Sequence, residues 1–195
     1  MIWAQKKDQN TLPNLELNGF RVVLRPMRLS DHAEWKRVRS TNQERLKEFE
    51  PKWAKDSFSK EFFERRYDRH TRDWASDRAY CFLIFDKNTH ALIGGINLNS
   101  VCRGAAQNAS LGYWIDEAYE RQGFMSEAAR IIIQYAFETL KLHRINAECL
   151  PDNERSINLL KTLGFTEEGF AKSYFQIKGI WQDHVLFGLV NPDQA

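Results

Sequence analysis

Hydrophobic and polar positions follow two rhythms along the chain, one typical of strands and one typical of helices. Strands are predicted by short runs rich in apolar and β-branched residues, at 21–25, 80–85, 91–98, 109–115, 144–150, 174–177 and 180–187. Helices are predicted by segments in which apolar residues recur every three or four positions, at about 30–41, 59–74, 124–140 and 153–163. The pattern therefore predicts a fold that mixes strands and helices.

Turn and capping residues mark several boundaries of these elements. Ser30 is predicted as the N-cap of the first helix, with Asp31 in its first turn. Lys178-Gly179 separates the last two strands and predicts a hairpin turn. Gly164 follows the last helix, at the position where a left-handed residue most easily ends it. Gly94-Gly95 lies within a strand and indicates a bulge or a close backbone neighbour.

The order of the elements limits how the strands can pair. Strands joined by tight turns pair antiparallel, whereas a helix between two strands allows them to lie parallel. The helix at 124–140 connects the strands at 109–115 and 144–150, so this pair is predicted to be parallel. The chain is therefore expected to form an α+β fold around a mixed, mostly antiparallel sheet.

Composition favours a single globular domain. The chain has 195 residues, of which 43% are hydrophobic and 13% aromatic, enough to build a sizeable core. We expect one domain at 15–190, preceded by a loose polar lead-in at 1–14. The net charge of +2 does not indicate a nucleic-acid-binding protein. Residues 21–78 carry 16 Lys or Arg against 11 Asp or Glu, which fits solvated helix faces better than an acidic or RNA-rich partner.

The cysteines and the apolar runs bear on metals and on the compartment. Cys81, Cys102 and Cys149 are scattered, and neither metal-ligand nor redox-pair spacing occurs. An odd number also argues against a disulfide framework, and no metal is expected. The first residues lack the apolar segment of a signal peptide, and no apolar run reaches the roughly 18 residues of a membrane span. We therefore expect a cytoplasmic protein with no membrane partner.

The most informative stretch is Tyr119–Ala128, at the junction between a predicted strand and a predicted helix. The free N–H groups of a first helical turn, together with the helix dipole, favour a bound anion. Gly123 allows the backbone to approach a ligand closely. A strand, a short loop with a glycine and a helix together indicate a phosphate-binding turn.

Four short motifs, in this order and spacing, resemble those of the GNAT family of N-acetyltransferases. They are Leu111-Gly112-Tyr113-Trp114-Ile115, Gln122-Gly123-Phe124-Met125-Ser126-Glu127-Ala128, Pro151-Asp152-Asn153-Glu154-Arg155-Ser156 and Leu163-Gly164-Phe165. The resemblance covers about 15–189. It implies an α/β/α fold with a central sheet of about seven strands, about four flanking helices and a parallel pair that splays apart.

Within that family, the end of the chain looks most like the Rim class, whose members acetylate the N-terminal amino groups of ribosomal proteins. The similarity lies in Gly169-Phe170-Ala171-Lys172 and in the segment 179–186. Glu50-Pro51-Lys52 and the loop 100–104 look like the alanine-directed members of the class. The resemblance therefore implies transfer of an acetyl group from acetyl-CoA to a protein N-terminus, by direct attack in a ternary complex. No direct nucleic-acid binding is expected.

The resemblance places the coenzyme on the glycine-containing loop and on the neighbouring strand. The backbone at 121–126 would bind the pyrophosphate, and the pantetheine arm would lie beside the strand. The implied coenzyme-binding residues are Trp114, Ile115, Arg121, Gln122, Gly123, Phe124, Met125, Ser126, Asn153 and Ser156. Two residues depart from the family pattern, Q/R-x-x-G-x-G/A. Glu120 brings a negative charge near the pyrophosphate, which is unfavourable unless Glu120 points to solvent and Arg121 compensates it. Met125 replaces a small residue.

The resemblance also implies catalytic roles for Ser156, Asn153 and Tyr113. Ser156 would protonate the departing thiolate, Asn153 would bind the coenzyme arm, and a backbone N–H near Tyr113 would stabilise the oxyanion. Asn153 is also a good helix N-cap, with Ser156 as its partner three residues on. Both roles are compatible, because a hydroxyl has one donor and two acceptor sites.

The general base is left open by the sequence. Ser110 and Phe175 stand where related enzymes carry a glutamate. The remaining candidates are Glu148, Asp183, His184 and a chain of water molecules, although Asp183-His184 also fits a structural pair. An N-terminal ammonium has a pKa near 8, so only mild assistance is needed.

Two other functions fit the same motifs. One is acetylation of a small amine, such as a polyamine, an amino acid or an antibiotic. The other is coenzyme A binding without catalysis. A protein acceptor requires an open channel beside the strand at 174–187, whereas a small amine requires a closed, charged pocket.

Overall fold

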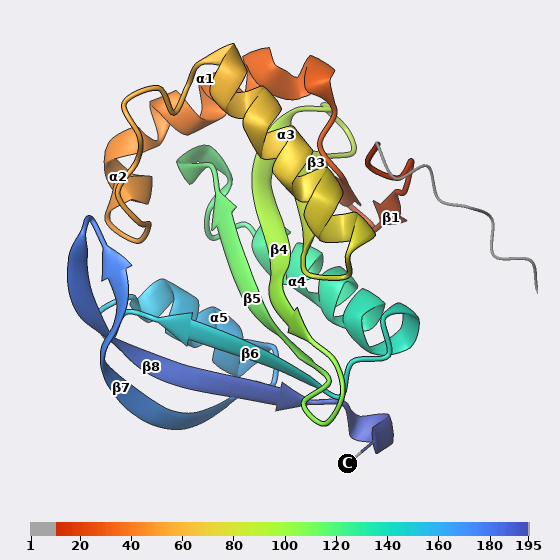
Figure 1. Cartoon of the computed structure of the whole chain (residues 1–195), viewed down its shortest axis with the longest axis vertical. Coiled ribbons are helices and arrows are strands. Elements are labelled where there is room, and N and C mark those ends of the chain that lie inside the picture. Colours follow the sequence, from red (N-terminus) through yellow and green to blue (C-terminus); the bar gives the residue numbers. More distant parts are fainter. Residues whose placement is uncertain (1–10, 195) are drawn as a thin grey trace, which may run out of the picture.

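The computed structural model describes residues 11–194, which form one mixed sheet of eight strands with helices packed against it (Figure 1). The strands lie in the order β1-β2-β3-β4-β5-β6-β8-β7. Every neighbouring pair is antiparallel except β5 and β6, which are parallel. The predicted α+β class and the predicted parallel pair are therefore confirmed. Most of the predicted lead-in, residues 1–10, lies outside the described residues.

The strands and helices have the following bounds. The strands are β1 Leu17–Asn18, β2 Val22–Arg25, β3 Tyr80–Asp86, β4 Leu92–Cys102, β5 Asn108–Ile115, β6 Arg144–Cys149, β7 Thr166–Ile177 and β8 Ile180–Val190. The α-helices are α1 His32–Thr41, α2 Gln43–Lys47, α3 Lys60–Ala75, α4 Phe124–Gln134 and α5 Glu154–Thr162. Short 3-10 turns lie at Leu29–Asp31, Glu117–Tyr119 and Pro192–Gln194, and a π-helical turn at Tyr135–Thr139 extends α4.

Helices cover both faces of the sheet. Side chains on a strand alternate between its faces, and β3 shows this directly. Phe82 packs in the large core cluster with Ile132 of α4, whereas Leu83 packs with Trp35 of α1 and Phe63 of α3. The fold is thus a sheet between two helical layers, as the family resemblance implied.

The parallel pair separates after three residue pairs. Its register runs from Asn108 opposite Arg144 to Ser110 opposite Asn146 and then ends. Beyond that point β5 continues beside β4, and β6 continues beside β8. The predicted splay is therefore present, and it opens the sheet between β5 and β6 (Figure 1).

Two glycines of β4 make room for β5 next to this opening. A Cβ on Gly94 would lie 2.5 Å from the carbonyl oxygen of Trp114, and a Cβ on Gly95 would lie 2.5 Å from the indole nitrogen of the same residue. The register between β3 and β4 also shifts beside Gly94. The close neighbour that the sequence indicated is therefore Trp114.

Three of the predicted boundaries can be compared directly with the structure. The N-cap at Ser30 is wrong, because a 3-10 turn occupies Leu29–Asp31 and α1 begins at His32. Asp31 is drawn into an ion pair of 2.7 Å with Arg25 instead. Gly164 does end α5 with a φ of 89°, and Lys178-Gly179 does form the hairpin turn, with φ values of 52° and 82°.

The hairpin of β7 and β8 is longer than predicted and bends toward α2. Three residues of β7 bulge between Ala171 and Phe175, and Ser173 in this bulge has a φ of 49°. At the tip, the amide of Lys178 donates a 3.1 Å hydrogen bond to the carbonyl oxygen of Glu50. The hairpin tip therefore lies against the segment between α2 and α3, as Figure 1 shows.

Candidate functional site

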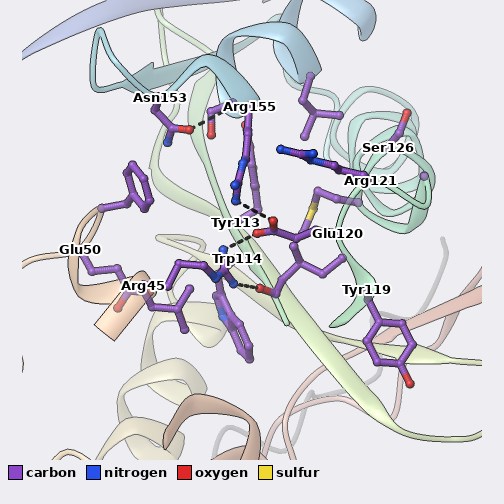
Figure 2. Close-up of a pocket in the computed structure, with 17 residues that line it drawn as sticks. Arg45, Glu50, Tyr113, Trp114, Tyr119, Glu120, Arg121, Ser126, Asn153 and Arg155 are labelled. Carbon is purple, nitrogen blue, oxygen red and sulfur yellow. Dashed lines mark hydrogen bonds and ion pairs between the residues drawn. The ribbon is translucent and has the colours of Figure 1, made fainter. Parts of the chain in front are cut away.

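A cavity of about 390 Å³ lies where β5, the loop before α4, α5 and the end of α2 come together (Figure 2). Most of the residues implied by the family resemblance line it: Tyr113, Trp114, Ile115, Arg121, Gly123, Met125, Ser126, Asn153 and Ser156. Gln122 and Phe124 do not. The Gln122 amide donates to the carbonyl oxygen of Ala118, and the Phe124 ring is buried against Tyr119.

The loop before α4 has the geometry of an anion-binding turn. Arg121 and Gly123 both adopt positive φ, 57° and 82°. The helix begins at Phe124, and its N-cap Gly123 has no side chain that could cap the first turn. The N–H groups of that turn are therefore free to bind a negatively charged ligand, and the helix dipole favours one.

Arg21 and Glu127 hold this loop in place. The Arg21 side chain donates 2.9 Å to the carbonyl oxygen of Gln122 and lies over the Phe124 ring at 4.5 Å. The Glu127 carboxylate accepts hydrogen bonds from the backbone amides of Arg21, at 2.7 Å, and Val22, at 3.3 Å. These contacts tie the first turn of α4 to the start of β2.

Glu120 lines the cavity and does not point to solvent, so its charge is compensated in another way than the sequence analysis considered. One carboxylate oxygen is bonded to Arg45 of α2, and the other is 2.6 Å from Arg155 of α5. Figure 2 shows Glu120 between the two arginines. Arg45 also donates 2.5 Å to the carbonyl oxygen of Ile115. Two guanidinium groups, rather than water, thus balance the charge of Glu120.

A smaller cavity of about 160 Å³ occupies the opening between β5 and β6. It shares Phe49, Tyr113, Asn153 and Ser156 with the larger cavity, so the two are contiguous. The splayed strands therefore connect the loop before α4 with a second chamber, which Glu148 and His184 also line.

Asn153 and Ser156 lie at this junction and also begin α5. The Asn153 side-chain oxygen accepts a 3.2 Å hydrogen bond from the backbone amide of Ser156. The predicted N-cap is therefore present. It uses only the oxygen of Asn153 and only the backbone of Ser156, so the Asn153 amide and the Ser156 hydroxyl take no part in the cap.

Tyr113 contributes a buried phenol to the same junction. Burial raises the pKa of Tyr113 to about 12, while a hydrogen bond with the Ser156 side chain opposes this shift. The phenol therefore stays protonated at neutral pH. Tyr113 and Ser156 form a hydroxyl pair where the two cavities meet.

The three candidate bases differ in where they lie. Glu148 lines the smaller cavity and accepts a 2.6 Å hydrogen bond from the Ser110 hydroxyl. His184 also lines it, and its Nδ1 lies 3.0 Å from the carbonyl oxygen of Gln182. Because a carbonyl only accepts, Nδ1 carries the hydrogen and Nε2 is left as the acceptor in the neutral ring. Asp183 instead accepts from the backbone amide of Ser173, at 2.8 Å, which is a structural role.

The segment after α2 forms another wall of the site and is braced by an ion pair. Arg39 binds both oxygens of Glu50, at 2.7 and 2.6 Å, and the Trp53 indole donates to the same carboxylate at 2.8 Å. The Arg39 guanidinium lies 4.3 Å from the Trp53 ring and 5.0 Å from the Trp114 ring. Phe49 and Glu50 are thereby held against the cavity.

Sequence reasoning missed two arginines that line this site, Arg45 and Arg155. Arg155 lies inside one of the recognised motifs, so its place in that motif was an available signal. Arg45 lies in a short polar helix without apolar periodicity, and the sequence offers no comparable signal.

The described residues hold neither a metal cluster nor a membrane helix. No group of three His, Cys, Asp or Glu side chains between residues 11 and 194 could hold a metal ion. In that same part of the chain, every helix is too short or too polar to cross a bilayer.

Burial raises the pKa of the Cys81 and Cys149 thiols to about 11, so both stay protonated at neutral pH.

Comparison with known proteins agrees with this geometry. A family model described as an acetyltransferase (GNAT) domain matches residues 21–166. The probable N-acetyltransferase YjcK of Bacillus subtilis is 36% identical over 91% of this chain and 98% of its own. The [ribosomal protein uS5]-alanine N-acetyltransferase of Escherichia coli is 33% identical over 95% of each chain.

A solved structure shows the same fold with a bound coenzyme. Mycobacterium smegmatis RimJ in complex with CoA-disulfide superposes with a TM-score of 0.84 at 28% identity, over 88% of this chain and 83% of that one. Together with the family model, these likenesses show that the chain belongs to the GNAT family of N-acetyltransferases.

Proposed function

We propose that this enzyme transfers an acetyl group from acetyl-CoA to the N-terminal α-amine of a protein, and that this protein is a ribosomal protein. The observation that carries the proposal is the surface around the smaller cavity. The rings of Tyr174 and Phe175 are exposed, and each contacts the ring of His184, which lines that cavity. An apolar surface at the mouth of the site fits a polypeptide better than a small polar amine. An acceptor of this kind places the reaction in the cytoplasm.

The residues of the larger cavity fit the coenzyme. The first turn of α4 offers N–H groups to a pyrophosphate, and the free edge of β5 at Tyr113–Ile115 offers backbone groups to an extended amide-containing arm. The coenzyme supplies an acetyl group activated as a thioester. The Asn153 amide, which the helix cap leaves free, lies at the junction where that arm would pass.

We propose Glu148 as the group that takes the proton from the acceptor ammonium. Its carboxylate lines the smaller cavity, is oriented by Ser110 and carries a charge that attracts a cation. His184 is less suited, because its ring is 3% exposed and is enclosed by Tyr174 and Phe175. An α-amine loses its proton near pH 8, so a carboxylate at this position gives sufficient assistance.

We propose that Ser156 donates a proton to the leaving sulfur and that Tyr113 supports this transfer. The Ser156 hydroxyl lies at the junction of the cavities and is hydrogen-bonded to the Tyr113 phenol. The phenol keeps its proton at neutral pH and can renew the proton that Ser156 gives to the leaving sulfur. Holding acceptor and donor in adjoining chambers supplies much of the rate by proximity.

The two alternatives are less well supported by these residues. A small amine would need no exposed aromatic surface beside its pocket. A coenzyme-binding module without catalysis would need neither Glu148 nor the Ser156–Tyr113 pair in the chamber beyond the coenzyme. Both alternatives can be tested in one assay.

The test is incubation of the enzyme with acetyl-CoA and purified ribosomal proteins, followed by intact-mass and N-terminal peptide analysis. The proposal expects one protein to gain a single acetyl group on its N-terminal residue. Acetylation of a polyamine or an amino acid alone would overturn the choice of acceptor. Coenzyme binding without turnover of any amine would favour the non-catalytic module.

A further inference from the structure

Glu120 links two arginines that come from different parts of the chain. Arg45 lies on α2 and Arg155 on α5, about 110 positions apart in sequence, yet each contacts one oxygen of the same carboxylate. The carboxylate is only 14% exposed and lies at the wall of the larger cavity. In Figure 2 the side chains of Arg45 and Arg155 meet at the Glu120 carboxylate, so the three form a connected row on the cavity wall.

The two arginines differ in how many of their donors are in use. Arg45 binds the carbonyl oxygen of Ile115 at 2.5 Å and the side-chain oxygen of Asn42 at 3.3 Å, in addition to Glu120. Its side chain is 22% exposed. Arg155 is 58% exposed, and among the described residues its guanidinium has one bond, the 2.6 Å contact of Nη1 with Glu120. Since a guanidinium has five N–H donors, Arg155 has donors left for a ligand while it keeps this contact.

The position of the row next to the loop indicates the kind of ligand. Glu120 directly precedes Arg121, where the anion-binding turn begins. Arg45, Glu120 and Arg155 together carry a net charge of +1, and Arg121 adds another cation on the cavity wall. This end of the cavity is therefore positive although a carboxylate lies in it, and it suits a phosphate group.

We propose that Arg155 binds the pyrophosphate of coenzyme A, and that Glu120 is a positioning residue that aims Arg155 at it. This inference rests on the proposed use of acetyl-CoA as the acetyl donor. Arg45 holds Glu120, Glu120 holds Arg155, and Arg155 supplies the side-chain cation beside the free amides of α4. The acidic residue that departs from the family pattern thus has a use in this chain. The pyrophosphate is preferred to the 3′-phosphate because the row adjoins the loop.

The proposal and simple charge repulsion predict opposite effects of removing the Glu120 charge on the affinity for the coenzyme. If Glu120 only repels phosphate, Glu120→Gln removes a negative charge and strengthens coenzyme binding. If Glu120 positions Arg155, the same change weakens binding, because a neutral amide holds a guanidinium less firmly than a carboxylate does. Gln preserves the size of the side chain, so the comparison isolates the charge.

The experiment is calorimetric titration of the wild-type enzyme and of E120Q, R155Q and the double variant with coenzyme A, dephospho-coenzyme A and pantetheine. We expect R155Q to raise the Kd for coenzyme A about tenfold, as for loss of one charge-assisted contact, and E120Q to raise it by a smaller factor. The double variant should resemble R155Q alone, because the two residues act in series. Dephospho-coenzyme A should show the same losses, and pantetheine should show none.

Lys161→Gln is the matched control. Lys161 lies on the same helix, is 54% exposed and pairs with Glu167, so its loss removes one surface charge without touching the cavity. Tighter binding by E120Q would overturn the positioning role, and an R155Q variant indistinguishable from K161Q would overturn the phosphate contact. Losses that disappear with dephospho-coenzyme A would overturn the choice of the pyrophosphate. A wild-type enzyme that binds no coenzyme A would instead refute the proposed function itself.

Discussion

The Ser110 hydroxyl donates a 2.6 Å hydrogen bond to Glu148 across the parallel pair β5 and β6, at the last residues before the two strands diverge. Ser110 stands in the register opposite Asn146, two residues before Glu148. The bond therefore aims the Glu148 carboxylate toward the opening between the strands. Because residue 110 is a serine, Glu148 on β6 is the only acidic residue among the described residues that line the smaller cavity.

Replacing Glu148 with Gln should lower kcat/KM for a peptide acceptor by roughly 10²-fold near neutral pH, the usual effect of a lost general base. The loss should shrink as the pH rises above about 8, because the α-amine then loses its proton to solvent. A pH–rate profile measures this. Ser110→Ala, which removes only the orienting bond, should show a smaller loss. A deficit of equal size at every pH would indicate that Glu148 is only structural.

Replacing Ser156 with Ala should lower kcat by roughly 10²-fold while the Kd for acetyl-CoA changes little, because the hydroxyl acts on the leaving sulfur. The cap of α5 should survive, since it uses the backbone amide of Ser156. Asn153→Ala is the contrasting variant, and it should cost about 1 kcal/mol of unfolding free energy by removing the cap. Single-turnover kinetics and thermal unfolding separate the two effects. An unchanged kcat in S156A would exclude the proton transfer.

The buried phenol of Tyr113 gives a stability prediction at alkaline pH. Its pKa is raised to about 12 in the folded protein, against about 10 when the chain is unfolded. Between these values the folded state holds a proton that the unfolded state has lost, so unfolding becomes easier as the pH rises from 10 to 12. Below pH 10 the stabilisation is fully present.

Tyr113→Phe should therefore reduce the fall in Tm between pH 10 and 12 without removing it, because the pKa of Tyr135 is also raised to about 12 by burial. Thermal melts at several alkaline pH values provide the measurement. A Tyr113→Phe protein whose Tm falls as steeply as that of the wild type would contradict the assigned burial of this phenol.

Trp181→Ala should raise KM for a protein acceptor several-fold, because exposed aromatic side chains often contribute strongly to protein recognition. Trp181 lies on β8 in the hairpin that also carries Tyr174 and Phe175. The Kd for acetyl-CoA and the KM for a short peptide should not change. Phe20→Ala, which removes another exposed ring far from the hairpin in sequence, is the control. Equal KM values for the two variants would show that the hairpin does not contribute to acceptor binding.

Gly123→Ala should weaken coenzyme A binding and lower stability by about 1 kcal/mol, because residue 123 has a φ of 82°. The added Cβ would also lie 3.0 Å from Arg21, which braces the loop. Gly169→Ala is the control, since a Cβ there meets no atom within 4 Å. Titration calorimetry and thermal melts measure both effects. A Gly123→Ala variant with wild-type affinity would show that the loop does not bind the coenzyme through its backbone.

The fold was predictable where apolar periodicity was strong. The parallel pair and its connecting helix could be inferred because 109–115, 124–140 and 144–150 are clearly patterned. The first half of β7 could not, because this edge strand is exposed on both faces and shows no alternation. The helix α2 is five residues long and mostly polar, and it carries too few apolar positions to be recognised.

Only those residues of the site that lie within the recognised motifs could be predicted from the sequence. Tyr113, Gly123, Asn153 and Ser156 lie within recognisable segments, and the structure brings them to one cavity. The orientation of Glu120 could not be inferred, since it depends on Arg45, which is 75 residues away in sequence. Long-range ion pairs of this kind leave no local pattern in a single sequence.

The early end of the pairing between β5 and β6 has a consequence for the lifetime of the protein. Alternate backbone groups of β5 after Ser110 point to a gap, and within the described residues no strand completes the ladder there. In the proposed mode of binding, the coenzyme would take the place of the missing strand. Ligand binding stabilises the folded state by RT ln(1 + [L]/Kd), or about 2.7 kcal/mol at one hundred times Kd. Resistance of this enzyme to heat and to proteases should therefore rise and fall with the supply of coenzyme A in the cell.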